Sequence, residues 1–92
     1  MYRIFETEKF AKSLDQDFGG QQVKIVNKLR TYVYPQLKHS PLYGPNIKKL
    51  RDWLPPTWRY RIGDYRFFYE IEFEAKIVFM ILAEHRGKAY KK

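Results

Sequence analysis

The chain has 92 residues, which allows a single domain, residues 1–92, with a small hydrophobic core. Eighteen Lys and Arg residues against ten Asp and Glu give a formal net charge of +8, and 18% of the residues are aromatic, so a polyanionic partner such as nucleic acid is expected. The absence of cysteine excludes disulfides, thiolate zinc sites and a cysteine nucleophile.

No segment resembles a targeting or membrane-spanning sequence. The longest apolar run, residues 77–83, is too short to cross a bilayer, and the first residues lack the apolar stretch of a signal peptide. A small secreted domain usually needs disulfides, so we expect a cytoplasmic protein without membrane contact. The two histidines are too few to suggest a metal site, and no glycine-rich phosphate loop is visible, so neither a metal nor a cofactor is predicted.

The N-terminal part predicts a short strand followed by two helices. Residues 2–5 favour a strand, and Thr7 is a suitable N-cap for a helix that Gly19-Gly20 ends. A second helix is expected to start near Gln21, and Pro35 is expected to terminate or kink it. The tight glycine turn predicts an antiparallel helical hairpin. The residues expected to line the buried helix faces are Phe10, Ala11, Leu14 and Phe18, then Val23, Val26, Leu29, Val33 and Leu37.

Residues 38–56 form a proline-rich connector that is long for a structureless loop in so small a domain. Leu50, Trp53 and Leu54 are expected to hold this connector against the core. Trp53 could instead be a platform for base stacking. A lone tryptophan is more commonly a buried anchor, and burial is therefore the prediction.

The C-terminal part predicts a three-stranded antiparallel meander. Residues 57–62 and 65–73 form a hairpin around Gly63-Asp64, where a leading glycine suits a type II′ turn. The third strand, residues 76–83, is almost entirely apolar and is therefore placed in the middle of the sheet, covered on both faces. A basic tail, residues 84–92, follows. The predicted class is α+β, with the helical hairpin packed on one face of the sheet.

Strand alternation divides the hairpin into an apolar face and a cationic face. Around the turn, Arg61 pairs with Arg66, so like charges stand opposite each other and a neutralising partner is expected. Glu70 is the nearest acid on that face. The cationic face is either a solvated surface or a phosphate site, and the bidentate guanidinium fork favours the second. The apolar face carries Trp58, Tyr60, Ile62, Tyr65, Phe67, Tyr69 and Ile71; the cationic face carries Arg59, Arg61, Arg66, Phe68 and Glu70.

Three further residues with useful chemistry follow the third strand, namely His85, Arg86 and Tyr90. At the end of a strand they can turn onto the cationic face. Together with the arginines they predict a metal-free ribonuclease site, because RNA carries its own nucleophile in the 2′-OH. The enzyme then needs a base for the 2′-OH proton, cations for the charge of the phosphorane and an acid for the 5′-oxygen. His85 is the expected proton-transfer residue.

The stretch from Trp58 to Tyr69 resembles the W-R-x-R-x-G-x-Y-R-x-x-Y hairpin of the RelE/ParE toxin superfamily. Residues 85–90 resemble the closing H-R-x-x-x-Y segment of that superfamily, and Lys48-Lys49-Leu50 resembles the basic element before the hairpin. The resemblance covers almost the whole chain. It implies a RelE-like, microbial-ribonuclease-like fold and a toxin of a type II toxin–antitoxin system.

The RelE-like branch of this superfamily cleaves mRNA in the ribosomal A site and is inhibited by a cognate antitoxin. The resemblance therefore implies a ribosome-dependent mRNA endoribonuclease that inhibits translation, monomeric when free and hetero-oligomeric with its antitoxin. Two alternatives stay open. The ParE-like branch poisons DNA gyrase and is not a nuclease, and a degenerate member would bind an antitoxin without any activity.

The resemblance also implies a role for each candidate site residue. The arginines of the cationic face bind and neutralise the scissile phosphate. Arg86 stabilises the phosphorane or the leaving oxygen, and Tyr90 stacks on a base or assists proton transfer. The further residues expected to bind RNA are Lys48, Lys49, Lys88, Lys91 and Lys92.

Overall fold

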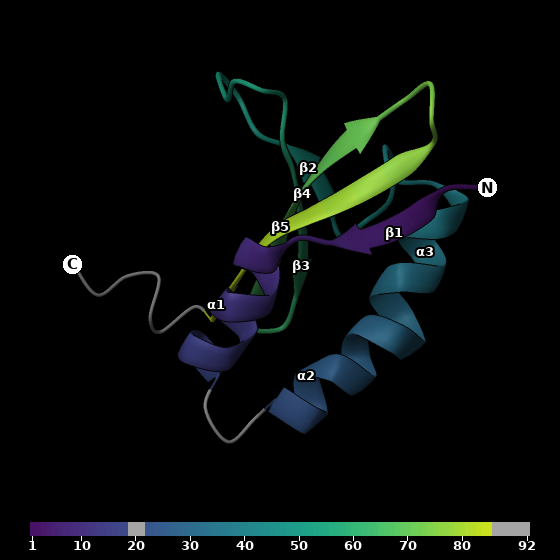
Figure 1. Cartoon of the computed structure of the whole chain (residues 1–92). Helices are drawn as coiled ribbons and strands as arrows, with labels where there is room; N and C mark the ends of the chain where they lie inside the picture. The colour runs from purple at the N-terminus through teal and green to yellow at the C-terminus, as the bar shows by residue number, and fades with distance from the viewer. Residues whose placement is uncertain (19–21, 86–92) are drawn as a thin grey trace.

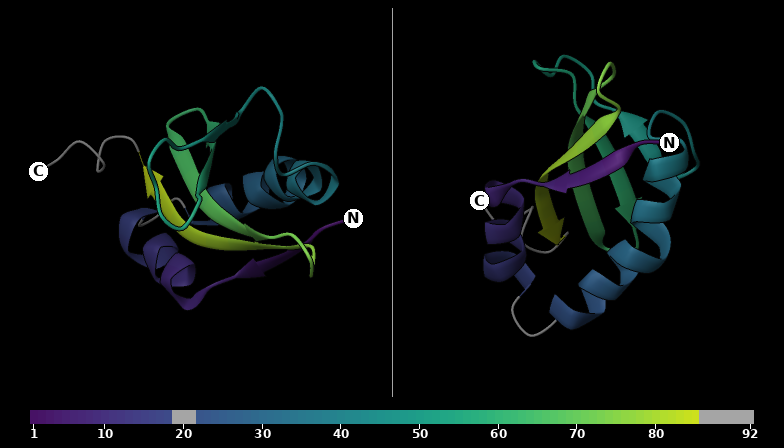
Figure 2. Two further views of the ribbon diagram at one scale, coloured as in Figure 1. Left: turned by 90° about the horizontal axis from the view of Figure 1, so that it is seen from above. Right: turned by 45° about the vertical axis from the view of Figure 1, so that its right-hand side comes forward.

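The computed structural model describes residues 1–18 and 22–85, in which helices cover one face of a single sheet (Figures 1 and 2). No helix in these two ranges is long and apolar enough to cross a membrane. The elements in chain order are β1 (Arg3–Glu6), α1 (Glu8–Phe18), α2 (Gln22–Lys28), the π-helical segment η2 (Leu29–Val33), α3 (Tyr34–His39), β2 (Ile47–Lys49), β3 (Trp58–Ile62), β4 (Tyr65–Glu72) and β5 (Ile77–His85).

The sheet has five strands in the order β1-β5-β4-β3-β2, with β1 parallel to β5 and every other neighbouring pair antiparallel. The α+β class is confirmed. The β3–β4 hairpin is also confirmed, and Gly63 has a φ of 58°, which a type II′ turn needs at its first central position. The third predicted strand, β5, lies between two other strands, but it is neither the middle strand of the sheet nor covered on both faces. β4 is the central strand, and β5 alternates between buried and half-buried residues because only its helix-facing side is covered.

β2 is a strand that the sequence did not predict. It lies within the connector, has three residues and pairs antiparallel with β3. A strand this short shows no alternation that could be read from the sequence. Its presence matters because it extends the sheet beyond β3 and supplies a further basic residue, Lys48, beside the predicted cationic face.

Thr7 joins β1, α1 and β5 at one point. Its Oγ1 accepts a hydrogen bond from the N–H of Phe10 at 3.2 Å, which is the predicted N-cap interaction. The same hydroxyl donates to the carbonyl oxygen of Met80 at 2.6 Å, and the N–H of Thr7 donates to that carbonyl at 3.1 Å. The start of α1 is therefore held against β5, where the parallel pairing with β1 ends.

The second helical arm runs through α2, η2 and α3 without a break in helical structure. Pro35 was predicted to terminate or kink it, but the arm continues to His39. Pro35 lies in the first turn of α3, where its missing N–H is least costly, and the N–H of Tyr34 reaches back to the carbonyl of Leu29 in the π-helical segment. The predicted Gly19-Gly20 turn lies outside the described residues.

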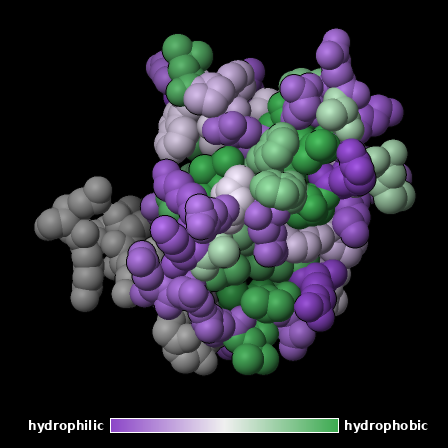
Figure 3. All heavy atoms as spheres, viewed as in Figure 1, coloured by the Kyte–Doolittle hydropathy of each residue, from purple (hydrophilic) through white to green (hydrophobic). Residues whose placement is uncertain are grey.

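The start of the second arm presents a different face from the predicted one. Val23 is 78% exposed, and Val26 is also on the surface. Both line an apolar groove between α1 and α2, where green spheres gather between the helices in Figure 3. Because the π-helical segment adds a residue to one turn, a spacing of four keeps residues on the buried side. These buried residues are Ile25, Leu29, Val33 and Leu37.

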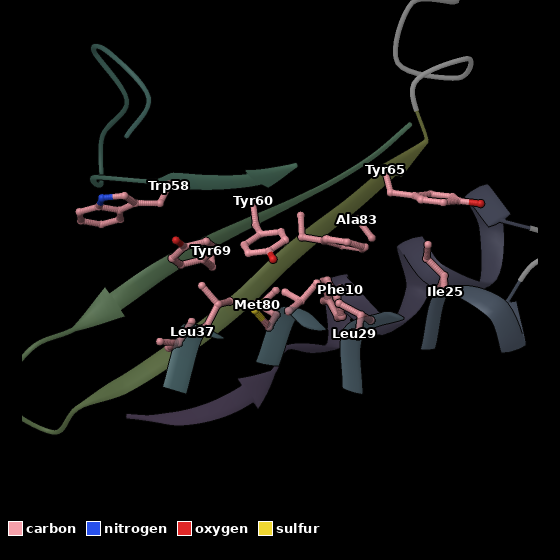
Figure 4. Close-up of a cluster of buried hydrophobic side chains, with 13 residues drawn as sticks. Phe10, Ile25, Leu29, Leu37, Trp58, Tyr60, Tyr65, Tyr69, Met80 and Ala83 are labelled. Carbon is pink, nitrogen blue, oxygen red and sulfur yellow. The ribbon is translucent and has the colours of Figure 1, made fainter. Parts of the chain in front are cut away.

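The core lies between the sheet and the helices, with strand side chains pointing toward α1 and the second arm (Figure 4). Tyr60, Phe67 and Tyr69 are fully buried, which confirms that these hairpin aromatics belong to the core. The hydroxyl groups of Tyr60 and Tyr69 have partners. Tyr60 donates to Oε1 of Gln36 at 2.8 Å, and Tyr69 donates to the carbonyl of Pro41 at 2.7 Å. The second bond fastens the beginning of the connector to the central strand.

The rest of the connector corrects the prediction for its apolar residues. Leu50 is half-buried, but Trp53 is 49% exposed and Leu54 is 92% exposed. The loop closes on itself instead of entering the core, because the N–H of Leu50 donates to the carbonyl of Thr57 at 2.9 Å. Trp53 stacks on Phe68, which lies on the sheet face that the helices leave open.

Candidate nucleic-acid interface

Three neighbouring strands place basic side chains on the sheet face opposite the helices. In the register between β3 and β4, Arg61 lies opposite Arg66 and Arg59 lies opposite Phe68, as predicted. β2 adds Lys48, which lies opposite Arg59. Directly paired residues share a face of a sheet, so Lys48 joins the three arginines on the cationic face.

A groove of about 640 Å³ opens beside β2 and β3. Three of its lining residues are basic, namely Lys48, Arg59 and Arg61, and the others are Pro45, Asn46, Ile47, Ile62 and Gly63. The Nε atom of Arg59 is buried and has no hydrogen-bond partner among the residues that the structure describes. A buried donor without an acceptor is costly, and a shift of the guanidinium toward the groove would let a phosphate oxygen supply a charge-assisted acceptor. The charge and the shape of this groove therefore suit an anion.

Lys48 and Lys49 were predicted to bind RNA together, but strand alternation separates them. Lys48 is on the cationic face, whereas Lys49 pairs with Trp58, which belongs to the apolar face. The Nζ atom of Lys49 lies 5.6 Å from the centroid of the Trp58 ring, within the range of a cation–π contact. Only Lys48 is thus placed beside the arginines.

A β-bulge in β5 decides what stands next to Arg66. Phe68 pairs with Leu82 and Tyr69 pairs with Met80, so Ile81 is an extra residue in β5. Beyond this point the alternation of β5 is shifted by one residue. Without the bulge, His85 would point to the cationic face.

The shifted register separates the last two residues of β5. Glu84 lies opposite Arg66 and therefore on the cationic face, whereas His85 lies opposite Tyr65 on the apolar face. The rings of Tyr65 and His85 meet edge to face, with centroids 5.1 Å apart and planes at 68°. The structure thus brings Lys48, Arg59, Arg61 and Arg66 together and places the His85 ring on the other side of the sheet.

Ser13 of α1 holds β5 just beyond the bulge. Its Oγ accepts a hydrogen bond from the N–H of Ala83 at 2.9 Å and donates to the carbonyl of Phe10 at 2.7 Å, and the residue is buried. β1 pairs with β5 only as far as Met80, so among the described residues no strand lies beside the N–H of Ala83 on that side. The hydroxyl replaces the missing strand and fixes the residue that precedes Glu84.

Sequence reasoning missed Glu84, which it assigned to the basic tail. No signal in the sequence could have placed it, because residues 77–82 are all apolar and carry no alternation that would mark the bulge. Five predicted site residues lie outside the described residues: Arg86, Lys88, Tyr90, Lys91 and Lys92. In the described part of the chain, no group of three or more His, Asp or Glu residues is placed to hold a metal ion.

Several solved structures have a similar fold. The chain is 26% identical to a chain of the toxin–antitoxin complex RelBE2 from Mycobacterium tuberculosis, with a TM-score of 0.71 and coverage of 92% of this chain and 98% of that chain. The isolated RelE toxin of E. coli gives 22% identity, a TM-score of 0.64 and coverage of 92% and 84%. A metal-bound toxin from Helicobacter pylori gives 20% identity, a TM-score of 0.67 and coverage of 98% and 100%.

A comparison of the sequence with models of protein families identifies the family of this chain. Residues 6–90 match the family model of the ParE toxin of the type II toxin–antitoxin system parDE. The chain therefore belongs to this family of toxins, within the RelE/ParE superfamily. A search of curated proteins gives no match.

Proposed function

We propose that this toxin is an endoribonuclease that cleaves mRNA on the ribosome and so inhibits translation. The observation that carries the proposal is the groove on the cationic face, where Lys48, Arg59 and Arg61 converge and the Nε of Arg59 has no acceptor among the described residues. Such a site suits the phosphate backbone of RNA, because arginine forks bind phosphate oxygens in a bidentate way.

The proposed reaction needs no added nucleophile. The 2′-oxygen of the ribose attacks the adjacent phosphorus and loses its proton to a base, and the P–O5′ bond breaks while the 5′-oxygen takes up a proton from an acid. The products are a 2′,3′-cyclic phosphate, which can open to a 3′-phosphate, and a 5′-OH end. Arg61 and Arg66 would neutralise the extra negative charge on the phosphorane. A chelator should leave the cleavage rate unchanged.

Two described residues compete for the role of the base. The sequence assigns proton transfer to His85, whose ring packs against Tyr65 on the apolar face. Glu84 is on the cationic face opposite Arg66, and an ionised carboxylate is an acceptor. We therefore assign the role of proton acceptor to Glu84. Arg86 and Tyr90 keep the roles predicted from the sequence. Arg86 stabilises the phosphorane or the leaving 5′-oxygen, and Tyr90 stacks on a base or assists proton transfer.

The proposed partners are the ribosome with its mRNA and a cognate antitoxin. Similar solved structures are complexes of RelE with RelB, from E. coli and from archaea, which supports an antitoxin partner for this chain. An acidic or amphipathic antitoxin that covers the cationic face would block the groove and neutralise its charge. The toxin is proposed to be monomeric when free, hetero-oligomeric with the antitoxin and cytoplasmic.

A second function is favoured by one observation, the match of the chain to the ParE family model. ParE-like toxins poison DNA gyrase and are not nucleases. In that case the cationic face would bind protein or DNA without cleaving it.

The deciding experiment compares cells that express the wild type or Arg66→Ala while RNA ends are mapped. New mRNA 5′ ends at codons in the A site, lost in Arg66→Ala, would support the nuclease. Arg30→Ala is the matched control, because Arg30 is an exposed arginine on the helical side. Growth arrest with intact mRNA and broken DNA would select the gyrase poison, and an absence of toxicity would identify a degenerate member.

A further inference from the structure

We propose that Trp53 and Phe68 form a stacking site for one base of single-stranded RNA, beside the phosphate groove. We call this pair the aromatic shelf. The proposal deepens the proposed function and rests on it, because it names where the RNA base next to the bound phosphate would lie.

The two rings of the aromatic shelf are parallel. Their centroids are 5.9 Å apart and their planes differ by 8°, so the two rings are stacked in parallel with a lateral offset. Phe68 is 8% exposed although it is on the open face of the sheet, whereas Trp53 is 49% exposed. Trp53 thus packs against the phenyl ring and leaves a large part of its own surface in solvent.

The backbone around Trp53 holds this position. Asp52 has a φ of 63°, a left-handed conformation that is uncommon for a residue other than glycine. The loop is closed by the hydrogen bond from Leu50 to Thr57, and Oγ1 of Thr57 donates to the carbonyl of Pro55 at 2.9 Å. The loop is therefore built to present the indole to solvent at the sheet surface.

The aromatic shelf is in line with the groove. Phe68 lies directly opposite Arg59, and Arg59 lies directly opposite Lys48 on the next strand. Adjacent strands are about 4.8 Å apart, so the phenyl ring and the two cations form one row across the sheet. A nucleotide lying along this row would place a phosphate next to the scissile one between Lys48 and Arg59, and its base over Trp53.

Charge complementarity points to a single-stranded nucleic acid, and the proposed function makes RNA the occupant. An exposed indole beside four cations matches a ligand that is both aromatic and anionic. Proteins that bind single strands combine these two features, a cationic groove for the backbone and aromatic rings for the bases. Stacking on an aromatic face tolerates any base, so the aromatic shelf should add affinity without strong sequence preference.

The test is a tryptophan fluorescence titration with a short single-stranded RNA at low salt. Trp58 is only 5% exposed, so a change in emission reports Trp53. RNA is expected to quench the wild type, whereas inorganic polyphosphate, which carries charge without bases, is expected to bind without quenching. Trp53→Ala should weaken RNA binding about tenfold and leave polyphosphate binding unchanged, while Trp53→Phe should retain most of the RNA affinity.

Equal RNA affinity in Trp53→Ala and the wild type would overturn the proposal, and so would equal quenching by polyphosphate and RNA. A loss of antitoxin binding alone in Trp53→Ala would also overturn it, because the aromatic shelf would then be a protein contact. A purely structural role of Trp53 would lower the thermal midpoint and affect both ligands alike. The proposed function fails separately. RNA binding that depends on Trp53 with no mRNA cleavage by the wild type would leave the aromatic shelf in place and remove the nuclease.

Discussion

Glu84 lies directly opposite Arg66 in the register between β4 and β5, and Arg61 lies opposite Arg66 on the other side. Two cations and a carboxylate therefore lie side by side on three neighbouring strands, Arg61 in β3, Arg66 in β4 and Glu84 in β5. Two arginines facing each other destabilise a sheet pair, and a carboxylate beside one of them offsets part of that repulsion. The sequence suggested Glu70 for this role, but Glu70 lies opposite Phe79, two positions beyond Phe68.

Replacing Glu84 by Gln should slow cleavage without weakening RNA binding. The amide keeps the size of the side chain but cannot take up the 2′-OH proton, so we expect the single-turnover rate on programmed ribosomes to fall about 10²- to 10⁴-fold. RNA affinity should be equal or higher, because one negative charge is removed from a cationic site. His85→Ala should reduce the rate less than tenfold, since the His85 ring is on the apolar face. The opposite order of the two variants would return proton transfer to His85.

Arg61→Ala should reduce the salt dependence of RNA binding. For single-stranded nucleic acid, each phosphate contact adds about 0.7 to the magnitude of the slope of log K against log salt concentration. The slope of the variant should therefore be smaller in magnitude by about 0.7. Lys49→Ala provides the matched control, because Lys49 lies over Trp58 on the apolar face and should leave the slope unchanged. Equal changes in both variants would mean that binding depends on total charge and not on the groove.

Ser13→Ala should destabilise the fold and disturb the end of β5. The substitution removes the acceptor for the buried N–H of Ala83, and an unsatisfied buried donor costs about 1–3 kcal/mol. Urea unfolding measures the free energy directly. Ser40→Ala, which removes only a hydrogen bond of 3.4 Å to the carbonyl of Tyr43, should change stability by less than about 0.5 kcal/mol. Similar stability of the two variants would show that Ser13 does not hold β5.

Tyr69 should make the protein sensitive to alkali. Burial, followed by the neighbouring Tyr60, raises the pKa of Tyr69 above its ordinary value near 10. Because the folded-state pKa is the higher one, the unfolded protein loses the proton first. The free energy of unfolding should therefore be constant below about pH 10 and should fall by about 1.4 kcal/mol per pH unit above it for this group.

Tyr69→Phe isolates the contribution of the hydroxyl. At neutral pH the variant should be less stable by about 0.5–1.5 kcal/mol, because the bond to the carbonyl of Pro41 is lost. Above pH 10 its stability should fall less steeply than that of the wild type. Urea unfolding between pH 7 and 11 measures both effects, and parallel curves for the two proteins would contradict the assignment.

Much of the fold could be predicted from local sequence. Gly63-Asp64 fixes the two-residue turn, and once the turn is known, alternation determines that Arg61 faces Arg66 and that Tyr60 and Phe67 enter the core. Thr7 marked the helix start for a similar reason, since an N-cap interaction spans only three residues. These features depend on neighbours in the chain, so the sequence by itself determined them.

Tertiary structure decided the composition of the site. The bulge at Ile81 moves Glu84 onto the cationic face and His85 off it, and the short β2 brings Lys48 in while Lys49 stays out. Trp53 was predicted to be buried, yet it is half-exposed and stacks against Phe68. Each of these placements depends on contacts between residues far apart in the chain, such as Ser13 with Ala83. Such contacts set the position of the bulge, and the bulge reverses the face of every side chain that follows it in β5. The local alternation of apolar and polar residues therefore cannot predict which face those side chains take.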